Sequence, residues 1–149
     1  MKFELIPVEA LHKHWPVIKI GCERVREFGG VPWIPEDIYA HLRFKMAAAY
    51  FGTDDDGKYR GFFVTETKRI PHSGEMSLHV WVLHAEAVKG DHFADVKCFM
   101  DETIDFLDEC ARHAKATLIT QDGRHGWSRF LGDTFKPTLV RFERVVMSS

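Results

Sequence analysis

The chain has 149 residues, of which 45% are hydrophobic and 13% are aromatic. This composition excludes a disordered protein and predicts one well-packed domain over residues 1–149. The formal net charge is −2, so we expect no nucleic-acid partner, because such proteins usually carry a basic excess. No apolar run approaches the roughly 20 residues that span a bilayer, so we also expect no membrane segment. The three cysteines are widely spaced, which predicts reduced thiols in a cytoplasmic protein.

The first elements along the chain are a strand and two helices. A short strand over residues 3–8 precedes a helix over residues 9–28, which a pair of glycines terminates. Pro16 fits poorly in the interior of this helix unless the helix begins near that residue. A second helix over residues 36–44 follows a proline-rich connector. That connector contains Trp33, which we expect to be the most exposed tryptophan.

Three strands come next, over residues 46–51, 59–69 and 76–84. An Asp-Gly turn joins the first two strands, and a segment with Pro71 and Gly74 joins the second to the third. Strict alternation in the third strand predicts two opposite faces, one with Met76, Leu78, Val80 and Val82 and the other with Ser77, His79, Trp81 and Leu83. Both faces are largely apolar, which is typical of a central strand that is covered on both sides.

The clearest periodicity predicts a helix over residues 91–114, whose apolar side chains recur every three or four positions. Its opposite side, which we expect to face water, carries Asp95, Glu102, Asp105 and Glu109. A strand over residues 117–120, a Gly-Arg-His-Gly-Trp turn, a short helix to Leu131 and a last strand over residues 138–147 complete the chain. The predicted order is β-α-α-β-β-β-α-β-α-β. It indicates an α/β (α+β) fold with a mixed, mostly antiparallel sheet and helices on both faces.

This order of elements resembles that of the GCN5-related N-acetyltransferase (GNAT) superfamily over nearly the whole chain. The turn over residues 123–127 is similar to one in small GNAT-like proteins that phages and prophages encode. The resemblance implies a fold that usually binds acetyl-CoA, with the pantetheine where the fourth and fifth strands splay apart and the pyrophosphate on a loop before the long helix. It implies cofactor-binding roles for Val82, Leu83, Lys89, Gly90, Arg124, Gly126, Trp127 and Arg129.

Two parts of the implied cofactor site are open to a second interpretation. Arg124 and Arg129 flank Trp127, and they either clamp an anion at the strand end or have a structural role. The segment around Lys89 and Gly90 has one glycine where the family pattern has two or more small residues, and it has no arginine.

The charge before the long helix also argues against a bound diphosphate. Asp91 is the expected N-cap and would occupy backbone donors that otherwise bind an anion. Glu86 and Asp95 lie nearby in the sequence. Each carboxylate would repel a diphosphate by on the order of a kcal/mol.

The resemblance further implies a base that deprotonates an amine and a tyrosine that protonates the thiolate. Glu66 and His79, on the predicted third and fourth strands, are the candidates for the base. A histidine on a covered strand is also commonly a packed, hydrogen-bonded residue. The segment after the turn contains Ser128 and no tyrosine. No motif has metal-ligand spacing, so we expect no metal site.

Two functions are compatible with these features. The degenerate phosphate loop and the missing tyrosine favour a phage- or prophage-type protein that keeps the fold without catalysis. Such a protein would be an accessory or virion-associated binding protein, in the host cytoplasm or the virion, with a protein partner or as a homo-oligomer. The intact order of elements favours the alternative, an acyl-CoA-dependent N-acyltransferase that acts on a small amine or a protein. A bound acetyl-CoA belongs to the second function.

Overall fold

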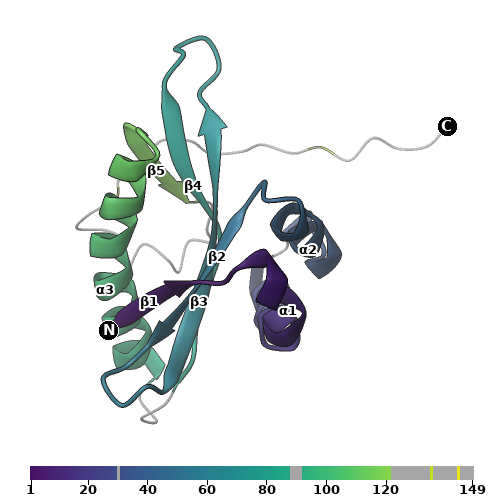
Figure 1. Cartoon of the computed structure of the whole chain (residues 1–149), viewed down its shortest axis with the longest axis vertical. Helices are drawn as coiled ribbons and strands as arrows, with labels where there is room; N and C mark the ends of the chain where they lie inside the picture. The colour runs from purple at the N-terminus through teal and green to yellow at the C-terminus, as the bar shows by residue number, and fades with distance from the viewer. Residues whose placement is uncertain (30, 88–91, 122–134, 136–143, 145–149) are drawn as a thin grey trace, which may run out of the picture.

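The computed structural model describes residues 1–29, 31–87, 92–121, 135 and 144 (Figure 1). The elements in chain order are β1 (Lys2–Leu5), the 3-10 turn η1 (Val8–Ala10), α1 (Leu11–Gly29), α2 (Pro35–Arg43), β2 (Ala48–Thr53), β3 (Tyr59–Arg69), β4 (Met76–Ala85), α3 (His92–His113) and β5 (Leu118–Gln121). This order confirms the predicted fold class. The predicted turn over residues 123–127, the helix to Leu131 and the last strand lie outside the described residues.

A five-stranded sheet forms the centre of the fold, in the order β1-β2-β3-β4-β5. Its first four strands are antiparallel neighbours, and β5 is parallel to β4. Parallel neighbours need a crossover connection, and α3 provides it. Figure 1 shows α1 and α2 on one face of the sheet and α3 on the other. The predicted mixed sheet with helices on both faces is therefore confirmed.

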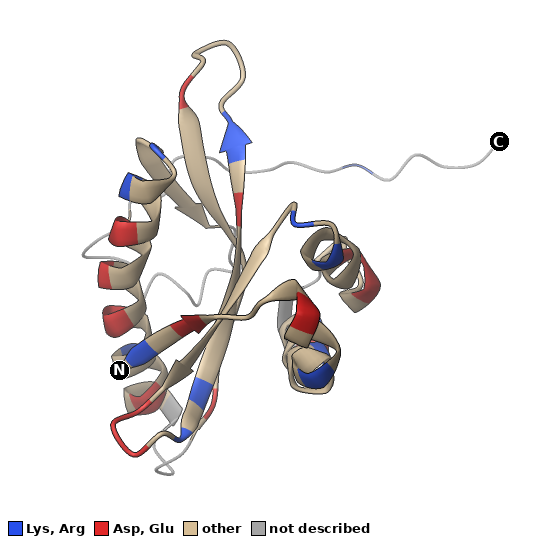
Figure 2. Ribbon diagram, in the orientation of Figure 1, with Lys and Arg blue, Asp and Glu red and all other residues tan. Residues whose placement is uncertain are grey.

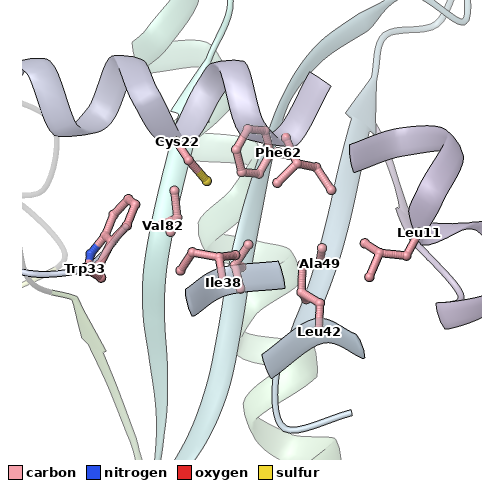
Figure 3. Packing of buried hydrophobic residues seen from close by; sticks show 10 residues of the cluster. Leu11, Cys22, Trp33, Ile38, Leu42, Ala49, Phe62 and Val82 are labelled. Atoms are coloured by element: carbon pink, nitrogen blue, oxygen red, sulfur yellow. The ribbon is translucent and has the colours of Figure 1, made fainter. Parts of the chain in front are cut away.

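Two hydrophobic clusters fill the space between the sheet and the helices, one on each face. The cluster under α1 and α2 (Figure 3) contains Leu11, Ile18, Cys22, Trp33, Ile38, Leu42, Ala49, Phe62, Val64 and Val82. The cluster under α3 contains Phe63, Leu78, Val80, Leu83, Ala85, Val96, Phe99, Met100, Leu107 and Ala111. Because β4 contributes to both clusters, the prediction of a strand covered on both sides is confirmed.

Helix α1 closely matches the helix predicted over residues 9–28. It starts at Leu11, and Pro16 lies inside it. Proline has no N–H, so the carbonyl four residues earlier, that of His12, receives no helical hydrogen bond. His12 and Pro16 are both exposed, so water can hydrate the carbonyl of His12. The helix therefore continues through Pro16.

The connector before α2 folds onto the sheet. Trp33 is only 9% exposed, and its ring lies 6.5 Å from that of Trp81 at an interplanar angle of 82°. The expectation that Trp33 is the most exposed tryptophan was wrong, because its indole packs in the cluster under α1 and α2, whereas Trp15 and Trp81 are more exposed. Asp37 accepts a hydrogen bond from the backbone N–H of Ile34 at 2.9 Å, which caps α2.

The alternation predicted for β4 is wrong after Val80. Between Val80 and Val82 the register against β3 shifts, so Trp81 is the extra residue of a β-bulge. Val82 therefore packs with the cluster under α1 and α2, whereas Leu83 packs with the cluster under α3. A bulge reverses the facing of every residue that follows it. Because both faces of β4 are apolar, the sequence pattern did not reveal the reversal.

The outer side of α3 carries most of the acidic residues predicted to face water. Figure 2 shows Asp and Glu residues in red at several positions along this helix. Glu102, Asp105 and Glu109 are exposed as expected. Asp95 is only 4% exposed, so its predicted position on the exposed side was wrong. The reason is an ion pair with β3, which belongs to the site described next.

Candidate functional site

The described pairing between β4 and β5 covers only the first part of β4. Their parallel pairing runs from Ser77 opposite Leu118 to Val80 opposite Gln121, whereas β4 continues to Ala85. Residues 81–85 are here called the β4 edge, and on one side residues 82–85 pair with β3. On the other side residues 81–85 have no strand partner within the described part of the chain. The bulge at Trp81 lies next to the last described β4–β5 pair, and a bulge bends a strand and increases its twist.

The predicted cofactor-binding residues Val82 and Leu83 lie on the β4 edge. Their side chains are 2% and 4% exposed, in opposite hydrophobic clusters. Only their backbone groups are therefore placed to meet a ligand. An unpaired strand edge offers alternating donors and acceptors, which suits an extended ligand that contains amide groups.

Two of the three predicted catalytic residues lie together beside this edge. Glu66 of β3, His79 of β4 and Thr120 of β5 stand directly opposite one another in the sheet register. The Nδ1 atom of His79 lies 2.8 Å from Oγ1 of Thr120, within hydrogen-bond distance. The carboxylate of Glu66 lies 3.0 Å from Nζ of Lys68. Ser128 lies outside the described residues.

Helix α2 forms a wall next to the bulge. The His41 ring lies 4.9 Å from the Trp81 ring at 85°, and Nδ1 of His41 donates a hydrogen bond to the carbonyl of Asp37 at 2.8 Å. Sequence reasoning did not single out His41 or Thr120. Neither lies in a motif, and both come close to β4 only through long-range packing.

The carboxylates expected to repel a diphosphate are paired with cations. Asp95 lies 3.2 Å from Nη2 of Arg60. Glu86 lies 3.3 Å from Nη1 of Arg24 and 3.2 Å from Nε2 of His84. The expected repulsion from these two carboxylates is therefore largely compensated. Asp91 and the predicted cofactor residues Lys89, Gly90, Arg124, Gly126, Trp127 and Arg129 lie outside the described residues.

Two buried groups close to α1 stay neutral at physiological pH. Burial raises the pKa of the Cys22 thiol to about 12, with a smaller contribution from Glu23. Burial also raises the pKa of the Tyr59 hydroxyl, and the Glu86 carboxylate adds to the increase. Neither group therefore supplies a reactive thiolate or phenolate. The phenolic oxygen of Tyr59 has no hydrogen-bond partner among the described residues.

A hollow of about 640 Å³ lies elsewhere on the molecule. Its lining comes from η1, the start of α1 and the end of α2, through Val8, Glu9, Leu11, His12, Tyr39, Arg43, Phe44 and Lys45. Figure 3 shows Leu11 and Leu42 at one end of the packed cluster and Trp33 with Val82 at the other. The hollow and the β4 edge are therefore separate features, at opposite ends of the helical layer.

The part of the chain that the structure describes contains neither a candidate metal site nor a candidate membrane helix. No group of three or more His, Cys, Asp or Glu side chains there could hold a metal ion. No helix there is long and apolar enough to cross a membrane.

The sequence matches no protein-family model and no curated protein at a significant level. Solved structures show clear similarity in fold. One described as a "probable acetyltransferase" has a TM-score of 0.69 at 16% identity, over 100% of this chain and 99% of that one. Ribosomal-protein-alanine N-acetyltransferase from Brucella melitensis has a TM-score of 0.61 at 14% identity, over 95% of this chain and 100% of that one.

A third similar structure is an aminoglycoside acetyltransferase from an uncultured soil metagenomic sample. Its TM-score is 0.61 at 9% identity, over 99% of this chain and 100% of that one. Identities this low establish a shared fold alone. Together with the order of the elements and the sheet topology, these similarities show that the chain has the fold of the GCN5-related N-acetyltransferases.

Proposed function

We propose that the protein is an acyl-CoA-dependent N-acyltransferase that binds acyl-CoA along the β4 edge. The observation that carries the proposal is the bulge at Trp81, which bends β4 just beyond its last described pair with β5. A chain with amide groups, such as pantetheine, can pair with a strand edge as an added strand. The fold supports this assignment, because similar solved structures are described as acetyltransferases.

The electrostatics at the start of α3 support an anionic ligand. A helix N-terminus attracts anions through the positive end of its dipole. The ion pairs of Glu86 and Asp95 reduce the repulsion that would oppose this attraction. Roles for Lys89, Gly90, Arg124, Gly126, Trp127 and Arg129 in holding the nucleotide stay predictions.

The acceptor would approach from the face of the sheet that α1 and α2 cover, where His79 lies. Acyl-CoA supplies the acyl group as a thioester: the amine nitrogen forms a bond to the carbonyl carbon, and the carbon–sulfur bond breaks. The His79 imidazole would take the proton that the amine loses, and Thr120 orients the ring through Nδ1. Glu66, directly opposite His79, would stabilise the resulting imidazolium. Donation of a proton to the thiolate by Ser128 stays a prediction.

This reaction requires an amine as the acyl acceptor, on a small molecule or on a protein. The other predicted function, a phage-type protein without catalysis, has no supporting observation in the described residues. It rests on the loop around Lys89 and Gly90 and on the segment after residue 126, which both lie outside them. We therefore do not propose it.

Thermal unfolding with and without acetyl-CoA tests the proposal. At 100 times its Kd, a ligand that binds only the folded state stabilises it by about 2.7 kcal/mol. We expect acetyl-CoA at millimolar concentration to raise the melting temperature clearly. Adenosine 3′,5′-bisphosphate, which lacks the pantetheine, is the matched control and should produce a smaller increase. Equal melting temperatures with and without acetyl-CoA would contradict the proposal.

A further inference from the structure

We propose that the hollow between η1 and α2 is a second ligand site, which binds a small, soluble amphipathic monoanion: a molecule with one negative charge on an apolar body. Its volume of about 640 Å³ falls in the range of pockets that hold small molecules. The hollow lies at the opposite end of the helical layer from the β4 edge. This inference therefore goes beyond the function proposed above and does not depend on it.

Apolar and aromatic side chains form the part of the hollow that would hold the body of the ligand. Leu11 is only 3% exposed and packs in the cluster under α1 and α2 (Figure 3). The Tyr39 ring packs edge-on against Trp15, with 4.9 Å between the ring centroids. Phe44 also lines the hollow, and 76% of this residue is exposed. The hollow thus combines a fixed apolar residue with two aromatic rings, and a bound ligand would cover the exposed ring of Phe44.

The charged side chains of the hollow carry one more positive than negative charge. Arg43 and Lys45 contribute two cations and Glu9 one carboxylate, while His12 adds a further positive charge only when it is protonated. All four side chains are exposed. None of them forms an ion pair or a side-chain hydrogen bond with another residue in the described ranges. Because no neighbour compensates the cations, they are available to a ligand, and a single anionic group matches the excess charge.

Backbone hydrogen bonds at the end of α2 fix the turn that carries Lys45. The N–H of Lys45 donates to the carbonyl of Leu42 at 3.2 Å, and the N–H of Met46 donates to that of His41 at 2.8 Å. These two bonds form a Schellman motif, whose left-handed position is usually occupied by glycine. Here Lys45 occupies it, with φ of 59°. The cation therefore extends from an ordered turn, so a ligand has little backbone to order when it binds.

The same motif ends α3 and provides a matched comparison. The N–H of Lys115 donates to the carbonyl of Arg112 at 3.2 Å, and the N–H of Ala116 donates to that of Ala111 at 2.9 Å. Lys115 has φ of 56°. It does not line the hollow. A lysine in this position complements the helix dipole without any ligand, so the aromatic hollow beside Lys45 is what distinguishes the end of α2.

Fluorescence titration with two probes tests the proposal. The first probe is 8-anilinonaphthalene-1-sulfonate, an aromatic monoanion. The second is N-phenyl-1-naphthylamine, which has the same aromatic body without the negative charge. The two Kd values, measured for wild-type protein and variants at low and high salt, separate the contribution of the charge from that of the apolar body.

Lys45→Gly and Lys115→Gly are the matched variants. Each replaces a left-handed lysine by glycine at the end of a helix, so we expect similar changes in the midpoint of urea unfolding. Only Lys45→Gly removes a charge from the hollow. It should weaken binding of the sulfonate roughly 3- to 10-fold at low salt and less at high salt. Binding of the neutral amine should not change.

Two further variants test the other parts of the hollow. Arg43→Gln should weaken binding of the sulfonate alone, as Lys45→Gly does. Phe44→Ala should weaken binding of both probes, because it removes an aromatic ring that would contact their shared body. If Lys45→Gly does not fold, Arg43→Gln takes its place in the comparison with Lys115→Gly.

An equal Kd for the sulfonate in wild-type protein and in Lys45→Gly would overturn the proposal. Equal weakening by Lys45→Gly and Lys115→Gly would also overturn it, because binding would then follow the total charge of the protein. The titrations contain no acyl-CoA, so their outcome is independent of acetyl-CoA binding at the β4 edge. Failure of either proposal therefore leaves the other intact.

Discussion

The row formed by Glu66, His79 and Thr120 shows how far single residues could be predicted. Glu66 and His79 could be chosen as candidates because the sequence places them on strands and because their side chains suit proton transfer. Thr120 could not be chosen, because its partner His79 is 41 positions away in the sequence. Parallel pairing of β4 with β5 brings them together, and no local pattern specifies which residues of the two strands face each other.

Substituting His79 tests its proposed role as the base. General-base catalysis typically contributes about 10²- to 10⁴-fold to a rate. We therefore expect His79→Ala to lower kcat by a factor in that range, measured as thiol release from acetyl-CoA with an amine acceptor found by screening. The Kd for acetyl-CoA should not change, because the β4 edge binds through its backbone.

Thr120→Val is the matched control for His79→Ala. It removes the hydroxyl next to Nδ1 and keeps the size of the side chain, so we expect a smaller loss of kcat than with His79→Ala. An unchanged kcat in His79→Ala would rule out this role. Loss of acetyl-CoA binding in the same variant would show that His79 has a structural role instead.

At the scale of elements, hydrophobic periodicity predicted most helices and strands correctly, and the errors have distinct physical causes. The sides of β4 predicted for Val82 and Leu83 were wrong, because a bulge gives no signal in the sequence of a strand that is apolar on both sides. The exposure of Asp95 was wrong because periodicity cannot foresee an ion pair with another element. Both errors fall beside the candidate site, where local rules are often overridden.

The close packing of α1 on β3 gives a prediction about stability. A Cβ atom at Gly21 would lie 2.3 Å from Cε1 of the Phe62 ring, which is fully buried. Overpacking a core typically costs about 1–3 kcal/mol, whereas replacing glycine by alanine in a helix contributes about 1 kcal/mol of stability. We therefore expect Gly21→Ala to lower the free energy of unfolding, as measured by urea denaturation.

Phe62→Leu provides the matched background for Gly21→Ala. The smaller side chain removes the ring that the added methyl group would meet. The penalty of Gly21→Ala should therefore shrink or reverse in this background, since contacting residues are energetically coupled. A stabilising Gly21→Ala in the otherwise wild-type protein would show that α1 is not packed this closely.

For the whole molecule, the candidate site depends on topology more than on any motif. The meander, the crossover through α3 and the bulge at Trp81 together place the β4 edge beyond the last described pair of β4 with β5. The element order was predictable from the sequence because each helix and strand has its own periodicity. The bulge at Trp81 and the register of β4 against β5 were not predictable, because they depend on pairing between strands that are distant in sequence.

The central claim is that acyl-CoA binds along the β4 edge, and amide hydrogen exchange of the wild-type protein with and without acetyl-CoA tests it most directly. Ligand that pairs with the strand should slow exchange at residues 81–85 and in the first turn of α3. Exchange in the β3–β4 turn over residues 70–75 should not change. Protection confined to the hollow between η1 and α2, or no change at residues 81–85 when ligand is bound, would contradict the claim.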